Sequence, residues 1–457
     1  MHWPLREVLA ALGCAPSATV DGNAVVLRFS TDSRDLQPGD LFVALAGARH
    51  DGHDHVAASL QAGAVAALVE RPVSGADGEV VVPSTEQALM TLAIAWRRRI
   101  APQVIAITGS NGKTTVKDMV VCILRADADA RGVPPDQEVL GTLGNFNNHL
   151  GLPLTLLRLR AGHRRAVLEL GMNHAGELTR LSQAAQPQVA LVNNVQRAHV
   201  GHFADMKAVA AAKGEIFAGL LPGGIAVINA DDPSAGQLTA LAGTHRVSTF
   251  ACSQQATVGP LLADLPFGAG QQLVIEVAGK RHACLLPVPG RHNAFNALAA
   301  ISATLALGVS VDVACAALEK FSPPASRLQL RAGQQGAQVI DDTYNANPDS
   351  VLAAIAVLAG RTGTRVLVLG DLGELGDGAA AMHAELGAAC RAAGIEHLFG
   401  LGGLAQAAVA GFGEGAQATL EPDQLLAWLQ PLLGPQTTVL VKGSRFMRME
   451  RIVQGLT

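Results

Sequence analysis

A short glycine-containing turn near residue 110 combines the residue types that hold the phosphates of a nucleotide. Residues 105–115 read Ile-Ala-Ile-Thr-Gly-Ser-Asn-Gly-Lys-Thr-Thr. Glycines let backbone N–H groups turn toward an anion, Lys113 supplies a positive charge, and Thr114 offers a hydroxyl to Mg²⁺. The general P-loop pattern requires a glycine where this chain has Ile107, so the turn departs from it, and a chance glycine turn is the alternative. The candidate phosphate contacts are Gly109, Ser110, Asn111, Gly112, Lys113, Thr114 and Thr115.

The residues on either side predict that this turn joins a strand to a helix. Val104, Ile105 and Ile107 form a short apolar, β-branched run before it. Apolar residues after it recur at helical spacing, and these are Val116, Met119, Val120, Ile123 and Leu124. A helix that begins at the turn directs its positive N-terminal end at the bound anion.

Two side chains that follow apolar strands are candidate metal ligands. Residues 166–168 are apolar and lead to Glu169, and α/β proteins bind ligands at the carboxyl ends of their strands. His199 follows another apolar stretch and a polar turn. A capping or surface histidine is the commoner outcome for such a residue, and His202 competes for the same role.

Lys213 lies within an apolar helical stretch, residues 208–220. The residues that form its apolar stripe are Val209, Ala212, Ile216, Phe217 and Leu220. Lys213 borders this stripe, so the simple interpretation is a lysine whose stem packs and whose charge reaches water.

Several blocks together resemble the Mur ligases, a family of ATP-dependent, amide-forming enzymes of cell-wall synthesis. In order along the chain, the blocks are residues 108–115, 145–153, 169–174, 193–199, 212–217, 290–296 and 341–348. Residues 31–34 and 370–376 are most similar to the members that add D-alanyl-D-alanine to a UDP-muramoyl-tripeptide. The resemblance spans nearly the whole chain.

The resemblance implies roles for several residues. It implies that Lys213 is carbamylated by CO₂ and so becomes an oxygen ligand of Mg²⁺, together with Thr114, Glu169 and His199. Carbamylation needs a neutral amine, which a buried lysine with a lowered pKa supplies. For ATP, the resemblance places Arg327 on the phosphates and Asp342 near the ribose.

The remaining candidates concern adenine and the two substrates. Asn293 and Asn296 lie one helical turn apart and could bind adenine, although N-capping competes for Asn293. For the UDP end of the substrate the candidates are Ser33, Arg34, Asp51 and His53, which surface turns explain almost as well. For the muramoyl-peptide they are Asn145, Asn147 and Asn148, with polar loop residues as the alternative.

Length and pattern predict an α/β protein of three domains. A chain of 457 residues exceeds what one core usually organises. We expect a small α/β domain for the UDP substrate over 1–100, and a central, mostly parallel P-loop-type sheet for ATP over 101–322. A Rossmann-like open α/β domain over 323–457 is expected to contribute to ATP and amine binding. Two local expectations are a solvated helix end at residues 97–99 and an exposed loop over 127–138.

Charge, cysteines and hydropathy bear on partners and location. The net charge of −4 is too weak to favour nucleic acid or an anionic membrane as a partner. Six cysteines without a C-x-x-C pair favour a reducing compartment. The first residues lack a signal-peptide pattern, and no apolar run is long enough to insert in a membrane. We expect a cytoplasmic monomer.

The sequence therefore predicts an ATP- and Mg²⁺-dependent ligase that works through an acyl phosphate. Two alternatives are another ligase of the superfamily and a regulatory P-loop nucleotide hydrolase. The first would add diaminopimelate or lysine, or would be a folylpolyglutamate synthase. The diaminopimelate- or lysine-adding members carry an Asp-Asn-Pro block that this chain lacks in its C-terminal part.

Overall fold

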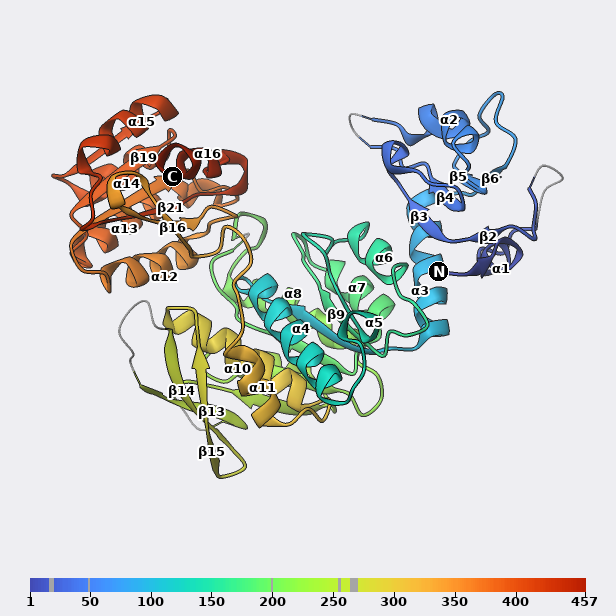
Figure 1. Ribbon diagram of the computed structural model, residues 1–457, viewed down its shortest axis with the longest axis horizontal. Helices are drawn as coiled ribbons and strands as arrows, with labels where there is room; N and C mark the ends of the chain where they lie inside the picture. Colours follow the sequence, from blue (N-terminus) through green and yellow to red (C-terminus); the bar gives the residue numbers. More distant parts are fainter. Residues whose placement is uncertain (16–19, 48–49, 199, 254–255, 264–269) are drawn as a thin grey trace.

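The computed structural model describes residues 1–15, 20–47, 50–198, 200–253, 256–263 and 270–457. Three α/β domains follow one another along the chain (Figure 1), which confirms the predicted fold class. Each domain is built on its own sheet, and the three sheets fall within the ranges expected from the sequence. The domain boundaries themselves stay predictions.

The N-terminal domain contains a parallel four-stranded sheet in the order β3-β4-β5-β6. A separate antiparallel pair joins β1 to β2. The strands are β1 (Trp3–Pro4), β2 (Val25–Val26), β3 (Arg28–Ser30), β4 (Asp40–Val43), β5 (Ala66–Val69) and β6 (Glu79–Val81), and the helices are α1 (Leu5–Ala11), α2 (Val56–Gln61) and α3 (Thr85–Ile100). The Ser84 side chain caps α3 by accepting from the Gln87 N–H. This helix leads from the first domain to the second.

The sequence predicts a solvated helix end at residues 97–99, and the structure differs from this at Arg97. Arg97 is buried, and its guanidinium donates to the carbonyls of Ala185 (2.9 Å) and Gln186 (2.7 Å). These two carbonyls lie at the C-terminal end of α7, where a helix leaves its last carbonyls without partners and favours a cation. Arg97 therefore ties the connecting helix to the central domain, whereas Arg98 and Arg99 are exposed.

Replacing Arg97 with methionine should lower the free energy of unfolding by about 2 kcal/mol, because two carbonyls lose a charged donor. Denaturant unfolding of the whole chain measures this change. Arg98→Met is the matched control, since an exposed substitution usually stays within about 0.5 kcal/mol. Equal midpoints for the two variants would contradict the capping role of Arg97.

The central domain contains nine strands in the order β15-β14-β13-β12-β11-β10-β7-β9-β8. The strands from β8 to β13 pair in parallel, whereas β13, β14 and β15 pair antiparallel. The strands are β7 (Gln103–Thr108), β8 (Val139–Gly141), β9 (Arg165–Glu169), β10 (Val189–Val192), β11 (Ile225–Asn229), β12 (Arg246–Phe250), β13 (Val258–Ala263), β14 (Gln271–Val277) and β15 (Lys280–Leu286). The antiparallel strands β13 to β15 were not foreseen.

Helices cover both faces of this sheet. They are α4 (Lys113–Ala130), α5 (Pro135–Glu138), α6 (Gly151–Leu156), α7 (Glu177–Ala185), α8 (Met206–Gly214), α9 (Ala235–Leu241), α10 (Arg291–Leu305) and α11 (Val311–Leu318). Alternate residues of β7 enter opposite cores: Ile105 and Ile107 pack with α4, α10 and α11, and Val104 and Ala106 pack on the side of α3, α7 and α8. The phosphate turn thus extends from a strand buried on both faces.

The expected exposed loop over 127–138 is only partly right, since residues 129–132 are exposed but much of the segment is helical. Helix α4 continues to Ala130, α5 occupies Pro135–Glu138, and Glu138 is buried. Arg131 and Arg165 both pair with the carboxylate of Glu138, which explains how an acidic residue is held inside.

The C-terminal domain has six strands in the order β16-β17-β21-β18-β19-β20, and only β16 runs antiparallel to its neighbour. The strands are β16 (Gln329–Ala332), β17 (Gln338–Asp342), β18 (Thr364–Gly370), β19 (His397–Leu401), β20 (Ala416–Thr419) and β21 (Thr437–Lys442). The helices are α12 (Pro348–Ala359), α13 (Ala379–Ala392), α14 (Ala405–Phe412), α15 (Pro422–Leu429) and α16 (Glu450–Leu456). Apolar clusters fill both faces of this sheet.

The apolar character of the helices and the state of the cysteines were also predicted from the sequence. Among the residues described, none of the helices combines the length and apolar character that crossing a bilayer requires. All six cysteines are free thiols, as their scattered spacing suggested.

Candidate active site

The phosphate turn depends on glycine at two positions. Gly109 and Gly112 have φ values of +153° and +77°, a region that side chains with a Cβ rarely adopt. A Cβ on Gly112 would also lie only 2.4 Å from Oδ1 of Asn296. Helix α4 begins at the next residue, Lys113, whose Nζ donates to the Gly109 carbonyl at 2.8 Å. The expected order of strand, glycine turn and helix is confirmed.

A cavity of about 2240 Å³ contains this turn and is lined by residues of all three domains. Most of the predicted site residues line it. They are Gly109, Ser110, Asn111, Gly112, Lys113, Thr114, Thr115, Asn145, Asn147, Asn148, Glu169, Lys213, Asn293, Asn296, Arg327 and Asp342. The sequence thus predicted a set of residues that the fold brings together from positions more than 200 residues apart.

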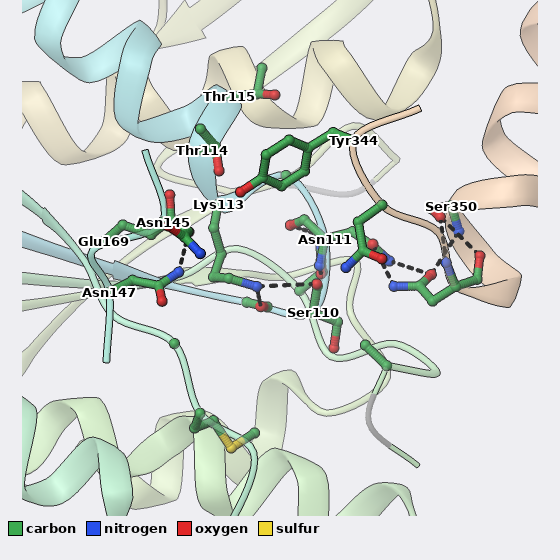
Figure 2. Close-up of a pocket in the computed structure, with 18 of the residues that line it drawn as sticks. Ser110, Asn111, Lys113, Thr114, Thr115, Asn145, Asn147, Glu169, Tyr344 and Ser350 are labelled. Atoms are coloured by element: carbon green, nitrogen blue, oxygen red, sulfur yellow. Dashed lines mark hydrogen bonds between the residues drawn. The ribbon is translucent and has the colours of Figure 1, made fainter. Parts of the chain in front are cut away.

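Glu169 carries a buried carboxylate oxygen that has no hydrogen-bond partner among the described residues. Its side chain accepts from Nδ2 of Asn147 at 2.8 Å through Oε1, whereas Oε2 is buried without a hydrogen bond (Figure 2). An unpaired carboxylate oxygen in a buried site is costly unless a cation or a donor neutralises it. This orphan oxygen fits a bound Mg²⁺, which prefers oxygen ligands.

Lys213 is buried at the wall of the cavity, unlike the surface lysine that the simple interpretation supposed. Only 2% of the residue is exposed, and in the described part of the chain its Nζ has no hydrogen-bond or ion-pair partner. Burial, reinforced by the charge of Lys113, places the pKa of Lys213 well below its usual value. The side chain therefore offers the neutral amine that reaction with CO₂ requires.

Lys113 is half-buried and lies close enough to Lys213 for its charge to lower the pKa of that amine. Burial lowers the pKa of Lys113, while the carboxylate of Glu169 raises it. Figure 2 shows Lys113 between Glu169 on one side and Ser110 on the other. Lys113, Lys213, Glu169 and Arg327 thus line one cavity, an arrangement suited to an anion accompanied by a metal.

The predicted metal ligands can be followed only in part. His199 lies outside the described residues. Its competitor His202 is exposed, packs its ring against His174 at 5.1 Å between centroids, and does not line the cavity. The described residues contain no group of three or more His, Cys, Asp and Glu that could hold a metal. The predicted Mg²⁺ ligands are not such a group, because they include the Thr114 hydroxyl and a modified lysine.

The two asparagines expected at adenine are linked to the phosphate turn. Asn193 donates through Nδ2 to Oδ1 of Asn296 (2.9 Å) and to the Asn111 carbonyl (2.9 Å). Asn296 donates in turn to Oδ1 of Asn293 at 3.1 Å. The N-cap of α10 is Gly290, so N-capping by Asn293 is wrong. The Asn193 link was missed because its partners lie about a hundred residues away.

Arg327 and Asp342, two predicted ATP contacts from the C-terminal domain, line the cavity. Arg327 donates through Nη2 to the Thr114 hydroxyl at 2.9 Å, and its guanidinium lies 4.2 Å from the ring centroid of Tyr344. Asp342 pairs with Lys442 at 2.6 Å in a buried contact. This ion pair was not predicted from the sequence, because Asp342 and Lys442 lie 100 residues apart.

The C-terminal domain also contacts the phosphate turn directly. Asn111 and Asn347 exchange two hydrogen bonds between their carboxamides, at 3.1 and 2.7 Å. Nearby, Arg197 forms ion pairs with Asp349 at 2.9 Å and with Glu385 at 2.8 Å. Asn347 also caps α12, so the first turn of this helix is fixed against the nucleotide loop.

Two strand ends of the C-terminal domain form one wall of the cavity. The Gly373 N–H, after β18, donates to the Ser444 hydroxyl, after β21, at 2.9 Å. Both residues line the cavity, together with Arg445 and Phe446. The sequence missed the opposite wall, where Gln87 and Arg98 of α3 project from the N-terminal domain. Their polar side chains among apolar helix residues were the available signal.

The four candidates for the UDP end lie away from this cavity. Arg34 pairs with Asp32, the residue before Ser33, which lowers the pKa of Asp32 to about 2. Asp51 pairs with Arg71 and accepts from the backbone of His53, and these bonds hold its pKa below the usual range. These contacts stabilise local turns. A role in UDP binding stays a prediction.

Comparisons with known proteins cover nearly all of the chain. Three family models match: "Mur ligase family, catalytic domain" at residues 28–97, "Mur ligase middle domain" at 107–304, and "Mur ligase, glutamate ligase domain" at 326–445. The UDP-N-acetylmuramoyl-tripeptide–D-alanyl-D-alanine ligase of Escherichia coli K12 is 38% identical over 437 residues, covering 93% of each chain.

Solved structures of MurF superpose on nearly the whole chain. The crystal structure of MurF from Acinetobacter baumannii superposes with a TM-score of 0.91 at 35% identity, covering 99% of this chain and 98% of that one. MurF ligase from Thermotoga maritima, solved in complex with ADP, gives a TM-score of 0.83 at 26% identity, with 94% and 96% covered.

Other ligases of the superfamily are more distant. A structure of UDP-N-acetylmuramoyl-L-alanyl-D-glutamate–2,6-diaminopimelate ligase gives a TM-score of 0.55, and folylpolyglutamate synthase from Mycobacterium tuberculosis gives 0.63, both at 19% identity. Coverage of this chain is 97% and 81%, and of those chains 93% and 94%. These two share the fold alone.

Proposed function

Because the chain belongs to the Mur ligase family, we propose that it is the ATP-dependent ligase that joins D-alanyl-D-alanine to UDP-N-acetylmuramoyl-tripeptide. The product is the UDP-muramoyl-pentapeptide. The observation that carries the proposal is one cavity, lined by three domains, that holds both the phosphate turn and the buried pair Glu169 and Lys213. The alternatives of another superfamily ligase or a regulatory nucleotide hydrolase are not favoured.

The reaction follows from how these residues would bind ATP. Lys113 and the backbone amides of the turn hold the β- and γ-phosphates, and Arg327 approaches them from the third domain. The terminal carboxylate of the tripeptide attacks the γ-phosphorus, which gives an acyl phosphate and ADP. The amine of D-alanyl-D-alanine then attacks the acyl carbon, and phosphate leaves. Positioning and charge neutralisation dominate such phosphoryl transfer.

Glu169 and Lys213 would hold Mg²⁺ together with Thr114 and His199. When bound, the ion would neutralise phosphate charge. The unpaired Oε2 of Glu169 supports this assignment, as does the low pKa of Lys213, which favours the carbamate. We also propose a cytoplasmic location, in keeping with the six free thiols and a nucleotide-linked substrate.

The test of the proposal is phosphate release measured with ATP and UDP-muramoyl-tripeptide, with and without D-alanyl-D-alanine. Turnover that requires both substrates supports a ligase. Phosphate release that requires neither UDP-muramoyl-tripeptide nor D-alanyl-D-alanine would contradict the proposal and indicate a simple nucleotide hydrolase.

D-Alanyl-D-alanine should be accepted as the amine and free meso-diaminopimelate rejected. We assign amine binding to the wall that joins Gly373 to Ser444, since open α/β sheets bind ligands at the carboxyl ends of their strands. Competition between the two amines, followed by mass spectrometry of the products, measures the preference. A preference for diaminopimelate would leave the ligase class in place and change the member.

A further inference from the structure

A second cleft, separate from the active-site cavity, lies on the central domain beside α4. Its volume is about 360 Å³, and it shares none of its lining residues with the larger cavity. Lys117 and Arg125 line it from α4, together with Val121 between them, so that one face of the helix borders the cleft. The rest of the wall comes from residues 139–143 after α5 and from residues 158–163 after α6.

The charges of this cleft do not balance. Three arginines and one lysine line it against two carboxylates, Asp118 and Asp136. The two carboxylates are each engaged with one cation, Asp118 with Lys117 and Asp136 with Arg125. The other two cations, Arg158 and Arg160, have no carboxylate partner in the described part of the chain. Burial lowers the pKa of His163, the remaining titratable group, so this ring is neutral near pH 7.

Arg158 is the least satisfied of these groups. Its Nη1 is buried and lacks any hydrogen-bond partner. The structure gives its guanidinium no hydrogen bond to any described residue, whereas Arg160 donates to the carbonyls of Arg158 (2.9 Å) and Leu159 (3.0 Å). An arginine cannot escape this situation by losing its proton, as the buried Lys213 can. Arg158 is half-buried, so its other donors reach only the water of the cleft, and an anion there would compensate a charge that no described residue pairs.

We infer that this cleft is a binding site for a phosphate group, with Arg158 as its principal ligand and Arg160 and Lys117 beside it. A planar guanidinium with free donors matches the oxygens of phosphate and binds them in pairs. The cleft is larger than phosphate alone requires, so both inorganic phosphate and a small phosphomonoester fit its chemistry. This site is independent of the proposed ligase reaction, because no residue of the active-site cavity takes part.

The first test compares thermal unfolding in phosphate and in chloride at equal ionic strength. The protein is saturated with a non-hydrolysable ATP analogue and Mg²⁺, so that the β- and γ-phosphate positions of the phosphate turn are already filled. Phosphate should raise the Tm of the natural protein in a concentration-dependent way, because a ligand that binds only the folded state stabilises it. An equal rise in chloride would indicate simple screening and overturn the site.

Variants locate the effect. Arg158→Met keeps the length of the side chain and removes its charge, so its Tm without phosphate should equal or exceed that of the natural protein, and its response to phosphate should disappear. Arg164→Met is the matched control: Arg164 is exposed and lines neither cavity, and the response should persist. A full response in Arg158→Met, or a loss of equal size in Arg164→Met, would overturn the assignment.

A second readout needs no variant. Crystals of the natural protein soaked in selenate should show an anomalous peak within hydrogen-bond distance of Arg158, and peaks only elsewhere would reject the site. Repeating the Tm series with glycerol 3-phosphate identifies the source of the ligand. A larger shift than with inorganic phosphate indicates a phosphomonoester, and a smaller one indicates free phosphate.

Discussion

Replacing Lys113 with alanine should lower kcat by about a hundredfold or more, which corresponds to about 3 kcal/mol of lost transition-state stabilisation. The reason is geometric. Lys113 is the first residue of α4 and lies in the phosphate turn, so its charge can follow the γ-phosphate as negative charge moves onto the leaving oxygen. Steady-state phosphate release with all three substrates measures the effect.

The fold of this variant should survive, because the hydrogen bonds of Lys113 reach only carbonyls within the turn. Circular dichroism and the Tm check this point. Lys320→Ala, which removes an exposed lysine from the same domain, should retain normal turnover. Near-normal activity in a folded Lys113→Ala protein would remove the turn from the mechanism.

Replacing Lys213 with alanine should also lower kcat by about a hundredfold or more. The carbamate proposed on its amine would supply a negatively charged oxygen ligand, and alanine removes it. Lys207→Ala is a close control, because Lys207 lies on the same helix, α8, and is exposed. An exposed lysine should cost little, within about 0.5 kcal/mol.

Loss of activity alone does not distinguish a ligand from a packed side chain, so the decisive measurement is chemical rescue. Formate or acetate can enter the space vacated in Lys213→Ala and present a carboxylate where the carbamate stood. Ligation should recover partly and in proportion to the added acid, with no recovery in Lys113→Ala. A map of the active, Mg²⁺-bound enzyme that shows an unmodified amine at Lys213 would refute the carbamate.

Apolar patterning was sufficient to predict the strands that carry the site. The sequence predicts strands over 104–108, 166–170 and 225–229. β11 has the expected bounds, Ile225–Asn229, β7 begins one residue earlier than expected, and β9 begins and ends one residue earlier. These strands are buried on both faces, so their sequences are continuous apolar runs that leave little choice of conformation. The residues that end such runs, Thr108 and Glu169, therefore fall at the edge where ligands bind.

Burial of charged groups could not be predicted in the same way. Arg97 and Arg98 are adjacent and chemically identical, yet only Arg97 meets the end of a helix that begins about 80 residues later. Lys213 borders its apolar stripe as a surface lysine would, and only packing of the whole domain closes water away from it. In both cases burial depends on residues that are distant in sequence. The local spacing of apolar residues therefore does not predict it.

The antiparallel strands β13 to β15 escaped prediction for a different reason. Residues of β14 and β15 alternate between buried and exposed positions, as in a sheet with one solvated face. A parallel sheet covered on both sides predicts continuous apolar runs. The weaker, alternating pattern of β14 and β15 does not fit that expectation.

The strand order of the C-terminal domain has a consequence for how the chain is made. β21, the last strand in sequence, lies between β17 and β18 in the middle of the sheet, and it carries Lys442. During synthesis the earlier strands β17 and β18 have no central neighbour to pair with until residues 437–442 leave the ribosome. The first two domains can fold while translation continues. The third domain, and with it the complete cavity that three domains line, can form only after residues 437–442 have been made.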